Sequence, residues 1–158
     1  QVAGRVKELN PDMQFIEDAA MLHDIGIFMT DAPGLGCFGD HRYIEHGYLG
    51  HELLLKEGLN AHALVCERHV GTGISIMDIE ARDFPFPKRD MIPVSLEEKI
   101  VCFADKFYSK SKDDFEREKS IPEIREIIRS FGNDKLKQFD EWLIFFKEPF
   151  WNKELCNQ

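Results

Sequence analysis

The sequence has no long apolar run and no paired cysteines, and both absences narrow the class of protein. Of its 158 residues 43% are hydrophobic, yet no apolar stretch approaches the roughly 18 residues of a membrane-spanning helix. None of the four cysteines shows C-x-x-C spacing, and Cys66 and Cys102 lie in apolar runs, where a thiol packs as a small hydrophobic group. We therefore expect a cytoplasmic protein with reduced cysteines and no membrane partner.

Positive charge is also scarce. The chain carries 20 Lys and Arg against 29 Asp and Glu, which gives a formal net charge of -9. Such a balance repels phosphate backbones and provides little counterion release on binding. The composition therefore predicts no nucleic acid partner, although a local metal or basic pocket can still bind a small anion.

No segment alternates like a strand, and apolar residues recur at helical spacing along most of the chain. We predict one all-α domain over residues 1–158, because the chain is too short for two ordinary domains. Its core is expected in 1–110 and a C-terminal helical extension in 120–150. The expected helices cover 2–9, 13–23, 41–57, 61–69, a segment that starts after Ser95 and carries Asp105, 122–131 and 134–146. Segments 30–40 and 83–94 are rich in glycine or proline and predict loops, and the charged segment 109–119 predicts a solvated loop or helix end.

Local signals predict how two of these helices begin and how the last one packs. Asp12 is expected to cap the second helix, and Ser95 with Glu98 to form a capping box. The aromatic residues of the last helix are expected to pack in the core. They are Phe139, Trp142, Phe145 and Phe146.

Histidine and aspartate side chains recur at the ends of successive predicted helices. His23 and Asp24 stand where an apolar helix meets Gly26, and a buried Asp105 after an apolar run would be unstable without a cation or hydrogen bonds. Divalent metals bind imidazole nitrogen and carboxylate oxygen, and facing helices can supply both. The pattern predicts a metal site made of His23, Asp24, His46, His69 and Asp105. The ordinary alternatives are an ion pair of Asp105 with Lys106 or Arg68, and a histidine that stabilises a helix C-terminus.

The order of these motifs resembles the HD-domain metal-dependent phosphohydrolase superfamily, and in particular a small, uncharacterised prokaryotic branch of its HDIG type. The likeness covers roughly residues 1–110. It is carried by His23-Asp24-Ile25-Gly26, by His46 with Gly50, by Glu67-Arg68-His69 with Gly71 and Gly73, and by Ala104-Asp105-Lys106. The resemblance implies an HD-type bundle of about six to eight helices that binds one or two divalent transition metal ions (Fe, Mn, Zn, Ni or Co). Within it His23, Asp24 and Asp105 match the core ligands, and His46 and His69 match the histidines of a second metal.

The chain departs from that pattern at one position, because the family's first-helix histidine is absent. We expect it about three residues before Gln1, with the first helix aiming its N-terminal end at the cluster.

The resemblance implies hydrolysis of a small phosphorylated metabolite or nucleotide. A bound metal lowers the pKa of its water and so supplies hydroxide at neutral pH. Asp24 would bridge metals or orient that water, and Lys106 and Arg68 would hold the substrate phosphate. Two alternatives remain open: a di-iron oxygenase with the same ligands, and a degenerate domain that binds a nucleotide and signals to a partner. The substrate and the oligomeric state are left open.

Overall fold

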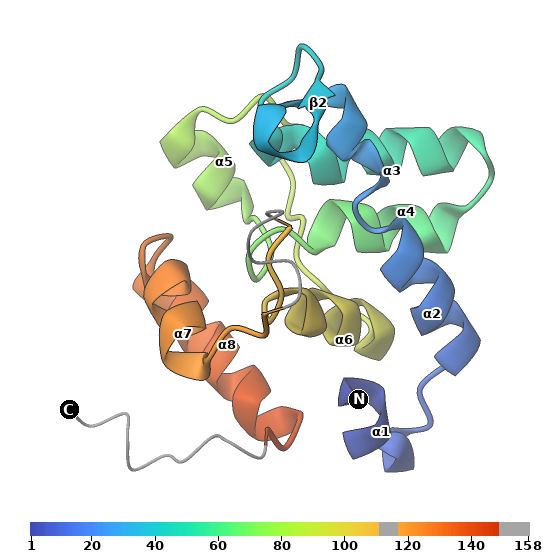
Figure 1. Ribbon diagram of the computed structural model, residues 1–158, viewed down its shortest axis with the longest axis vertical. Coiled ribbons are helices and arrows are strands. Elements are labelled where there is room, and N and C mark those ends of the chain that lie inside the picture. Colours follow the sequence, from blue (N-terminus) through green and yellow to red (C-terminus); the bar gives the residue numbers. More distant parts are fainter. Residues whose placement is uncertain (111–116, 149–158) are drawn as a thin grey trace.

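A computed structural model describes residues 1–110 and 117–148 and folds them mainly into helices (Figure 1). The α-helices in the described part are α1 (Val2–Arg5), α2 (Met13–Leu22), α3 (His46–Lys56), α4 (Asn60–Arg68), α5 (Ile76–Arg82), α6 (Leu96–Asp105), α7 (Ile121–Arg129) and α8 (Asn133–Phe145). Short 3-10 turns occupy Lys7–Leu9, Ile25–Met29, Pro33–Leu35 and Tyr43–Glu45. The predicted mostly helical chain is confirmed.

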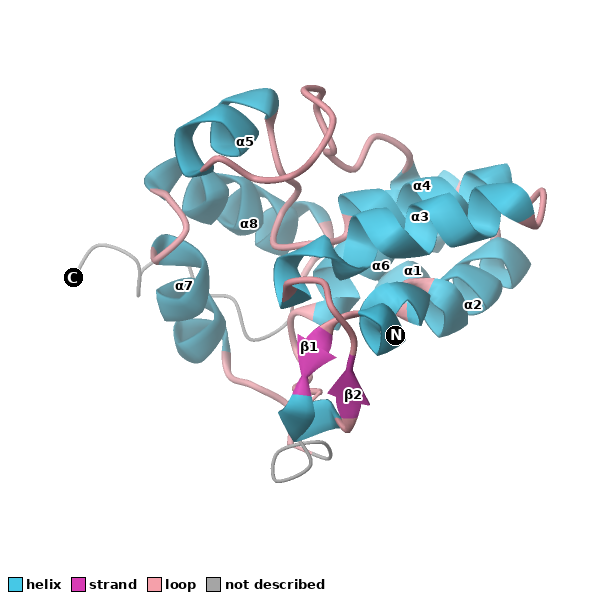
Figure 2. Ribbon diagram, turned by 90° about the horizontal axis from the view of Figure 1, so that it is seen from above, coloured by secondary structure: helices cyan, strands magenta, loops and turns pink. Residues whose placement is uncertain are grey.

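One small hairpin corrects the expectation of a chain without strands. Strands β1 (Asp31–Ala32) and β2 (Cys37–Phe38) pair antiparallel, with Asp31 opposite Phe38. Figure 2 shows the two side by side at one edge of the molecule. Two residues are too few to show a period of two in the sequence, so the segment could be predicted only as a loop.

Helix starts agree with the expected caps, with one exception. The Asp12 carboxylate accepts a hydrogen bond from the backbone N–H of Phe15 at 3.0 Å, and the Ser95 hydroxyl accepts one from that of Glu98 at 3.1 Å. The Glu98 side chain does not close a capping box, because it accepts from the N–H of Val94 and from Arg68 instead. Sequence analysis missed α5, whose seven residues begin at a capping box of Ser75 and Asp78.

The main core joins α6 to its neighbours on both sides. Helices α2 and α4 contact α6, α3 lies along α4, and α7 packs with α8 (Figure 1). Phe103 of α6 lies 5.5 Å from Phe139 and 4.9 Å from Phe146, measured between ring centroids. The core role predicted for Phe139, Trp142 and Phe146 is confirmed, but that of Phe145 is wrong because 45% of it is exposed. Cys66 and Cys102 are buried as expected.

The backbone at Gly26 lies close to the backbone of α3, and this contact positions the residues just before Gly26. A Cβ atom on Gly26 would lie 2.1 Å from the carbonyl oxygen of His46 and 2.5 Å from the amide nitrogen of Gly50. Only glycine, which has no Cβ atom, allows the two backbones to come this close. The turn after Asp24 therefore lies directly against the first turns of α3.

Three further expectations concern the ends and loops of the chain. Gln1 and Val2 line a cavity with Ala104 and Phe107, so the chain start lies beside the segment that carries Asp105; a histidine before Gln1 stays a prediction. The loop predicted over 109–119 includes residues 111–116, which lie outside the described residues. Among the described helices, none is long and apolar enough to cross a membrane.

Candidate functional site

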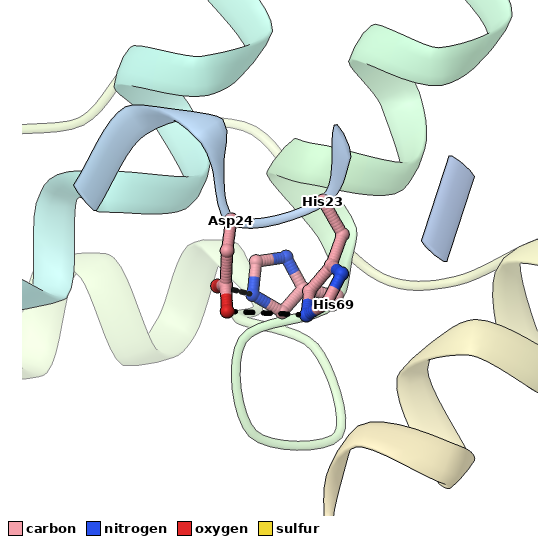
Figure 3. A group of neighbouring side chains, drawn as sticks. All are labelled: His23, Asp24 and His69. Carbon is pink, nitrogen blue, oxygen red and sulfur yellow. Dashed lines mark ion pairs between the residues drawn. The ribbon is translucent and has the colours of Figure 1, made fainter. Parts of the chain in front are cut away.

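Five predicted site residues meet where four helices end or begin. His23 follows α2, Asp24 comes next, His46 opens α3, His69 follows α4, and Asp105 ends α6. Figure 3 shows the side chains of His23, Asp24 and His69 converging, with a dashed line from each oxygen of the Asp24 carboxylate to a nitrogen of one imidazole. Residues that are up to 82 positions apart in sequence thus form one cluster.

The three imidazoles share one orientation. Nδ1 of His23, of His46 and of His69 lies 2.7 Å from the backbone carbonyl oxygen three residues earlier. A carbonyl oxygen can only accept, so each Nδ1 carries the ring proton and donates it. Each Nε2 therefore points into the cluster, and it presents a lone pair there where the ring is neutral.

The three Nε2 atoms lie close to the carboxylates and to each other. His23 Nε2 is 3.3 Å from Asp24 and 3.3 Å from Asp105, and His69 Nε2 is 3.3 Å from Asp24. His46 Nε2 lies only 3.1 Å from His69 Nε2. Two lone pairs at that distance repel unless a proton, a hydrogen-bond donor or a cation lies between them. The ligand atoms of His23, Asp24 and His69 also lie within 4.8 Å of one another, a spacing that could hold a metal ion.

Two lysines complete the cluster. The ammonium of Lys110 lies 2.8 Å from both oxygens of Asp24 and 3.5 Å from Asp105. Lys106 lies 2.8 Å from Asp105 and donates to the carbonyl oxygen of His69 at 3.1 Å. The prediction placed Lys106 here but missed Lys110, because its segment was interpreted as solvated. Helix α6 ends at Asp105, so Lys110 reaches the cluster from the irregular segment after the helix, and helical spacing could not have found it.

The electrostatics separate the histidines into two kinds. Burial lowers the pKa of His23, but hydrogen bonds and charges from Asp105 and Asp24 outweigh burial and raise that pKa to about 9. Burial and the neighbouring His69 lower the pKa of His46 to about 3, and burial also lowers the pKa of His69. At neutral pH His23 is therefore charged, whereas His46 and His69 are neutral and can accept a hydrogen bond at Nε2.

Both carboxylates stay ionised. Burial raises the pKa of Asp24, but the hydrogen bond and charge of His23, together with the charge of Lys110, prevail and hold this pKa well below its usual range. Burial also raises the pKa of Asp105, but the charge of Lys106 and the hydrogen bond from His23 outweigh burial. The pKa of Asp105 therefore lies well below its usual range. Two carboxylates thus face two ammonium groups and one imidazolium, which leaves one positive charge in excess.

The structure does not bring Arg68 to the cluster. Its Nη1 lies 3.0 and 2.9 Å from the two oxygens of Glu98. Glu67, its neighbour in the sequence, pairs with Arg89. Arg68 thus joins α4 to α6, and its predicted contact with a substrate phosphate stays a prediction.

A cavity of about 380 Å³ opens on the cluster, and we call it the inner cavity. Its volume is in the range of small-molecule sites. Four cationic and two acidic side chains line it: Arg82, Lys106, Lys110 and Lys135, with Asp78 and Asp105. Aromatic rings of Tyr43, Phe84 and Phe131 also line it. The buried hydroxyl of Thr72, on the same wall, has no hydrogen-bond partner within the described residues.

Three comparisons with known proteins bear on the family. The chain is 36% identical over 128 residues to the uncharacterized protein MJ0778 of Methanocaldococcus jannaschii, which covers 74% of this chain and 68% of that protein. It is 32% identical to a tRNA (cytidine(56)-2'-O)-methyltransferase of Picrophilus torridus over 86% of this chain and 34% of that protein. It is 31% identical to the protein of the same name from Thermoplasma volcanium over 67% of this chain and 28% of that protein. The chain thus spans about a third of the length of the two named methyltransferases. No family model and no solved structure matches it.

These findings correct the predicted family and reaction. The named relatives are tRNA methyltransferases, which contradicts an HD-domain phosphohydrolase as well as the oxygenase and nucleotide-signalling alternatives. The physical reason is that the motifs specify which side chains converge, as they do here, but not which bond reacts. The names equally contradict divalent transition metal ions as the cofactor, because a methyltransferase draws on a methyl donor.

The predicted partners are corrected as well. The names specify tRNA, whereas the composition predicted a small phosphorylated substrate and no nucleic acid. A net charge sums over the whole chain and does not record that four cationic side chains line one cavity. With 36% identity over more than two thirds of that protein's length, this chain belongs to the family of the Methanocaldococcus jannaschii protein MJ0778.

Proposed function

We propose that this chain holds a nucleotide of a tRNA as part of a ribose-methylating enzyme. The observation that carries the proposal is the inner cavity, in which paired imidazole acceptors, a cationic wall and aromatic rings lie together. Each of these features suits one part of a ribonucleotide. The two named relatives support the choice of tRNA.

The imidazole pair suits a ribose hydroxyl. Nε2 of His46 and of His69 are 3.1 Å apart, neutral, and in need of a donor. A hydroxyl within hydrogen-bond reach of both would donate its proton and relieve the repulsion. Asp24, which lies 3.3 Å from His69 and 3.5 Å from His46, would stabilise the positive character of the ring that accepts this hydrogen bond.

The lysines suit a phosphate. Lys106 and Lys110 add positive charge on the side of the cluster that faces the inner cavity. Phosphate oxygens form charge-assisted hydrogen bonds with ammonium groups. The base would then lie against the aromatic rings, since stacking on such rings tolerates any base.

The same charges disfavour the methyl donor. S-adenosylmethionine, the usual donor of methyltransferases, carries a sulfonium cation beside the methyl group. The inner cavity holds more cationic than acidic side chains, and Asp105 is already paired with Lys106 and Asp78 with Lys135. The described residues therefore do not fit this group, and we assign the donor to another part of the enzyme.

The site residues enter this proposal with changed roles. His46, His69, Asp24 and Lys106 would contact or support the nucleotide, while His23 and Asp105 hold the cluster together. A single domain over residues 1–158 stays a prediction.

Binding of RNA tests the proposal. We expect an unmodified tRNA transcript and a single-stranded RNA pentamer to bind the protein, and Lys110→Ala to weaken both by roughly tenfold or more, because one charge-assisted contact is lost. Fluorescence anisotropy measures the affinities. Lys56→Ala removes an exposed lysine at the C-terminal end of α3 that does not line the inner cavity, and it should leave both affinities unchanged.

Two results would contradict the proposal. One is the absence of saturable RNA binding by protein that circular dichroism shows to be folded. The other is release of phosphate from RNA or nucleotides on addition of divalent metal, since the site would then be hydrolytic.

A further inference from the structure

A second cavity, of about 510 Å³, adjoins the inner one, and we call it the outer cavity. The β1–β2 hairpin turn, α7 and the segment after α6 line it. The two cavities share one wall, made of Tyr43, Asp105, Lys106, Lys110, Ile127 and Ile128. Two volumes thus meet at the pair of lysines.

We propose that the two cavities hold two adjacent nucleotides of one RNA strand, with the phosphate between them on Lys106 and Lys110. This inference rests on the proposed function and specifies its substrate as single-stranded RNA of at least two nucleotides. Each cavity is large enough for a nucleotide, at 380 and 510 Å³. The nucleotide whose ribose reaches His46 and His69 occupies the inner cavity.

The shared wall carries charge suited to a bridging phosphate. Lys106 and Lys110 are the cationic residues that line both cavities. Contacts with other side chains and with the backbone hold both ammonium groups in place. Lys106 pairs with Asp105 and donates to the carbonyl oxygen of His69, and Lys110 pairs with Asp24. A phosphate at this wall would meet two preordered ammonium groups, each paired with a carboxylate, and the His23 imidazolium leaves the cluster with one positive charge in excess to attract it.

Each cavity also offers its own surface for a base. Phe84 and Phe131 line the inner cavity but not the outer one, and Tyr108 lines the outer cavity but not the inner one, with 49% of it exposed. Tyr43 stands on the wall between them, 40% exposed. Stacking on aromatic rings is the usual way in which single-stranded RNA is held without regard to sequence.

The footprint can be tested with short RNA probes. We expect a 5′-phosphorylated dinucleotide to bind about tenfold or more tightly than the matching mononucleotide, because a second base stacks and a second contact becomes intramolecular. Leu35 lines the outer cavity alone. Leu35→Trp fills this space and should reduce the dinucleotide affinity to that of the mononucleotide, without changing the latter. Tyr108→Ala should weaken the dinucleotide alone in the same way.

The controls separate this inference from the proposed function. Leu9→Trp, at an exposed position that lines neither cavity, should change neither affinity. Equal affinities of mononucleotide and dinucleotide, or equal losses of both in Leu35→Trp, would overturn the two-nucleotide footprint while the single-nucleotide site stands. Failure of both probes to bind wild-type protein would overturn the proposed function itself.

Discussion

Replacing Gly26 by alanine is expected to lower the free energy of unfolding by about 3 kcal/mol or more. The new methyl group would lie 2.1 Å from the carbonyl oxygen of His46 and 2.5 Å from the amide nitrogen of Gly50. Both atoms belong to the backbone of α3, so no side-chain rotation can relieve the overlap. The turn after Asp24 would have to move away from α3, and RNA binding should be lost together with stability.

Gly4→Ala is the matched control for this substitution. Gly4 lies inside α1, and a Cβ atom there would meet nothing within 4 Å. Alanine is favoured over glycine in a helix by up to about 1 kcal/mol, so this variant should be neutral or slightly more stable. Urea unfolding measures both variants, and a Gly26→Ala protein as stable as Gly4→Ala would refute the close approach of the two backbones.

The second large effect is expected at the largely buried pair of Asp105 and Lys106. Asp105→Ala should lower the free energy of unfolding by about 3 kcal/mol, because it leaves a largely buried ammonium without its carboxylate. The two groups are 2.8 Å apart and each side chain is 13% exposed. Adding Lys106→Met should restore part of the loss, since the double variant no longer buries an unpaired charge.

A double-mutant cycle with urea unfolding measures this coupling. Glu126→Ala provides the contrast, because Glu126 pairs with Arg129 where the two side chains are 74% and 50% exposed. Exposed pairs contribute about 1 kcal/mol or less. Additive effects of Asp105→Ala and Lys106→Met, or a loss no larger than that of Glu126→Ala, would show that the pair is not buried as described.

Local signals explain which parts of the fold were predictable. Asp12 and Ser95 cap their helices because a cap depends on three or four neighbouring residues, and long helices such as α8 show their period over several turns. The strands of the hairpin at Asp31 and the seven-residue α5 are too short for a period to show in the sequence. Phe145 was misplaced because a helical stripe predicts a face only to within a residue or so.

The cluster itself was predictable because polar side chains inside apolar helices need partners. Asp105 after an apolar run and His23 on an apolar face indicated burial, and both lie in the cluster. Lys110 was missed because charge-rich segments usually face solvent. The reaction and the partner were wrong for a different reason: one set of imidazoles and carboxylates can serve several chemistries, and a net charge of -9 conceals a cationic cavity.

The most direct test of the central claim compares an RNA pentamer with its 2′-deoxy counterpart while the histidine rings are followed by NMR. A ribose hydroxyl between His46 and His69 predicts that RNA shifts the ring signals of these two residues and binds roughly tenfold more tightly than DNA, because DNA leaves the paired nitrogens without a donor. Equal affinities, with the signals of His46 and His69 unchanged by RNA, would contradict the account.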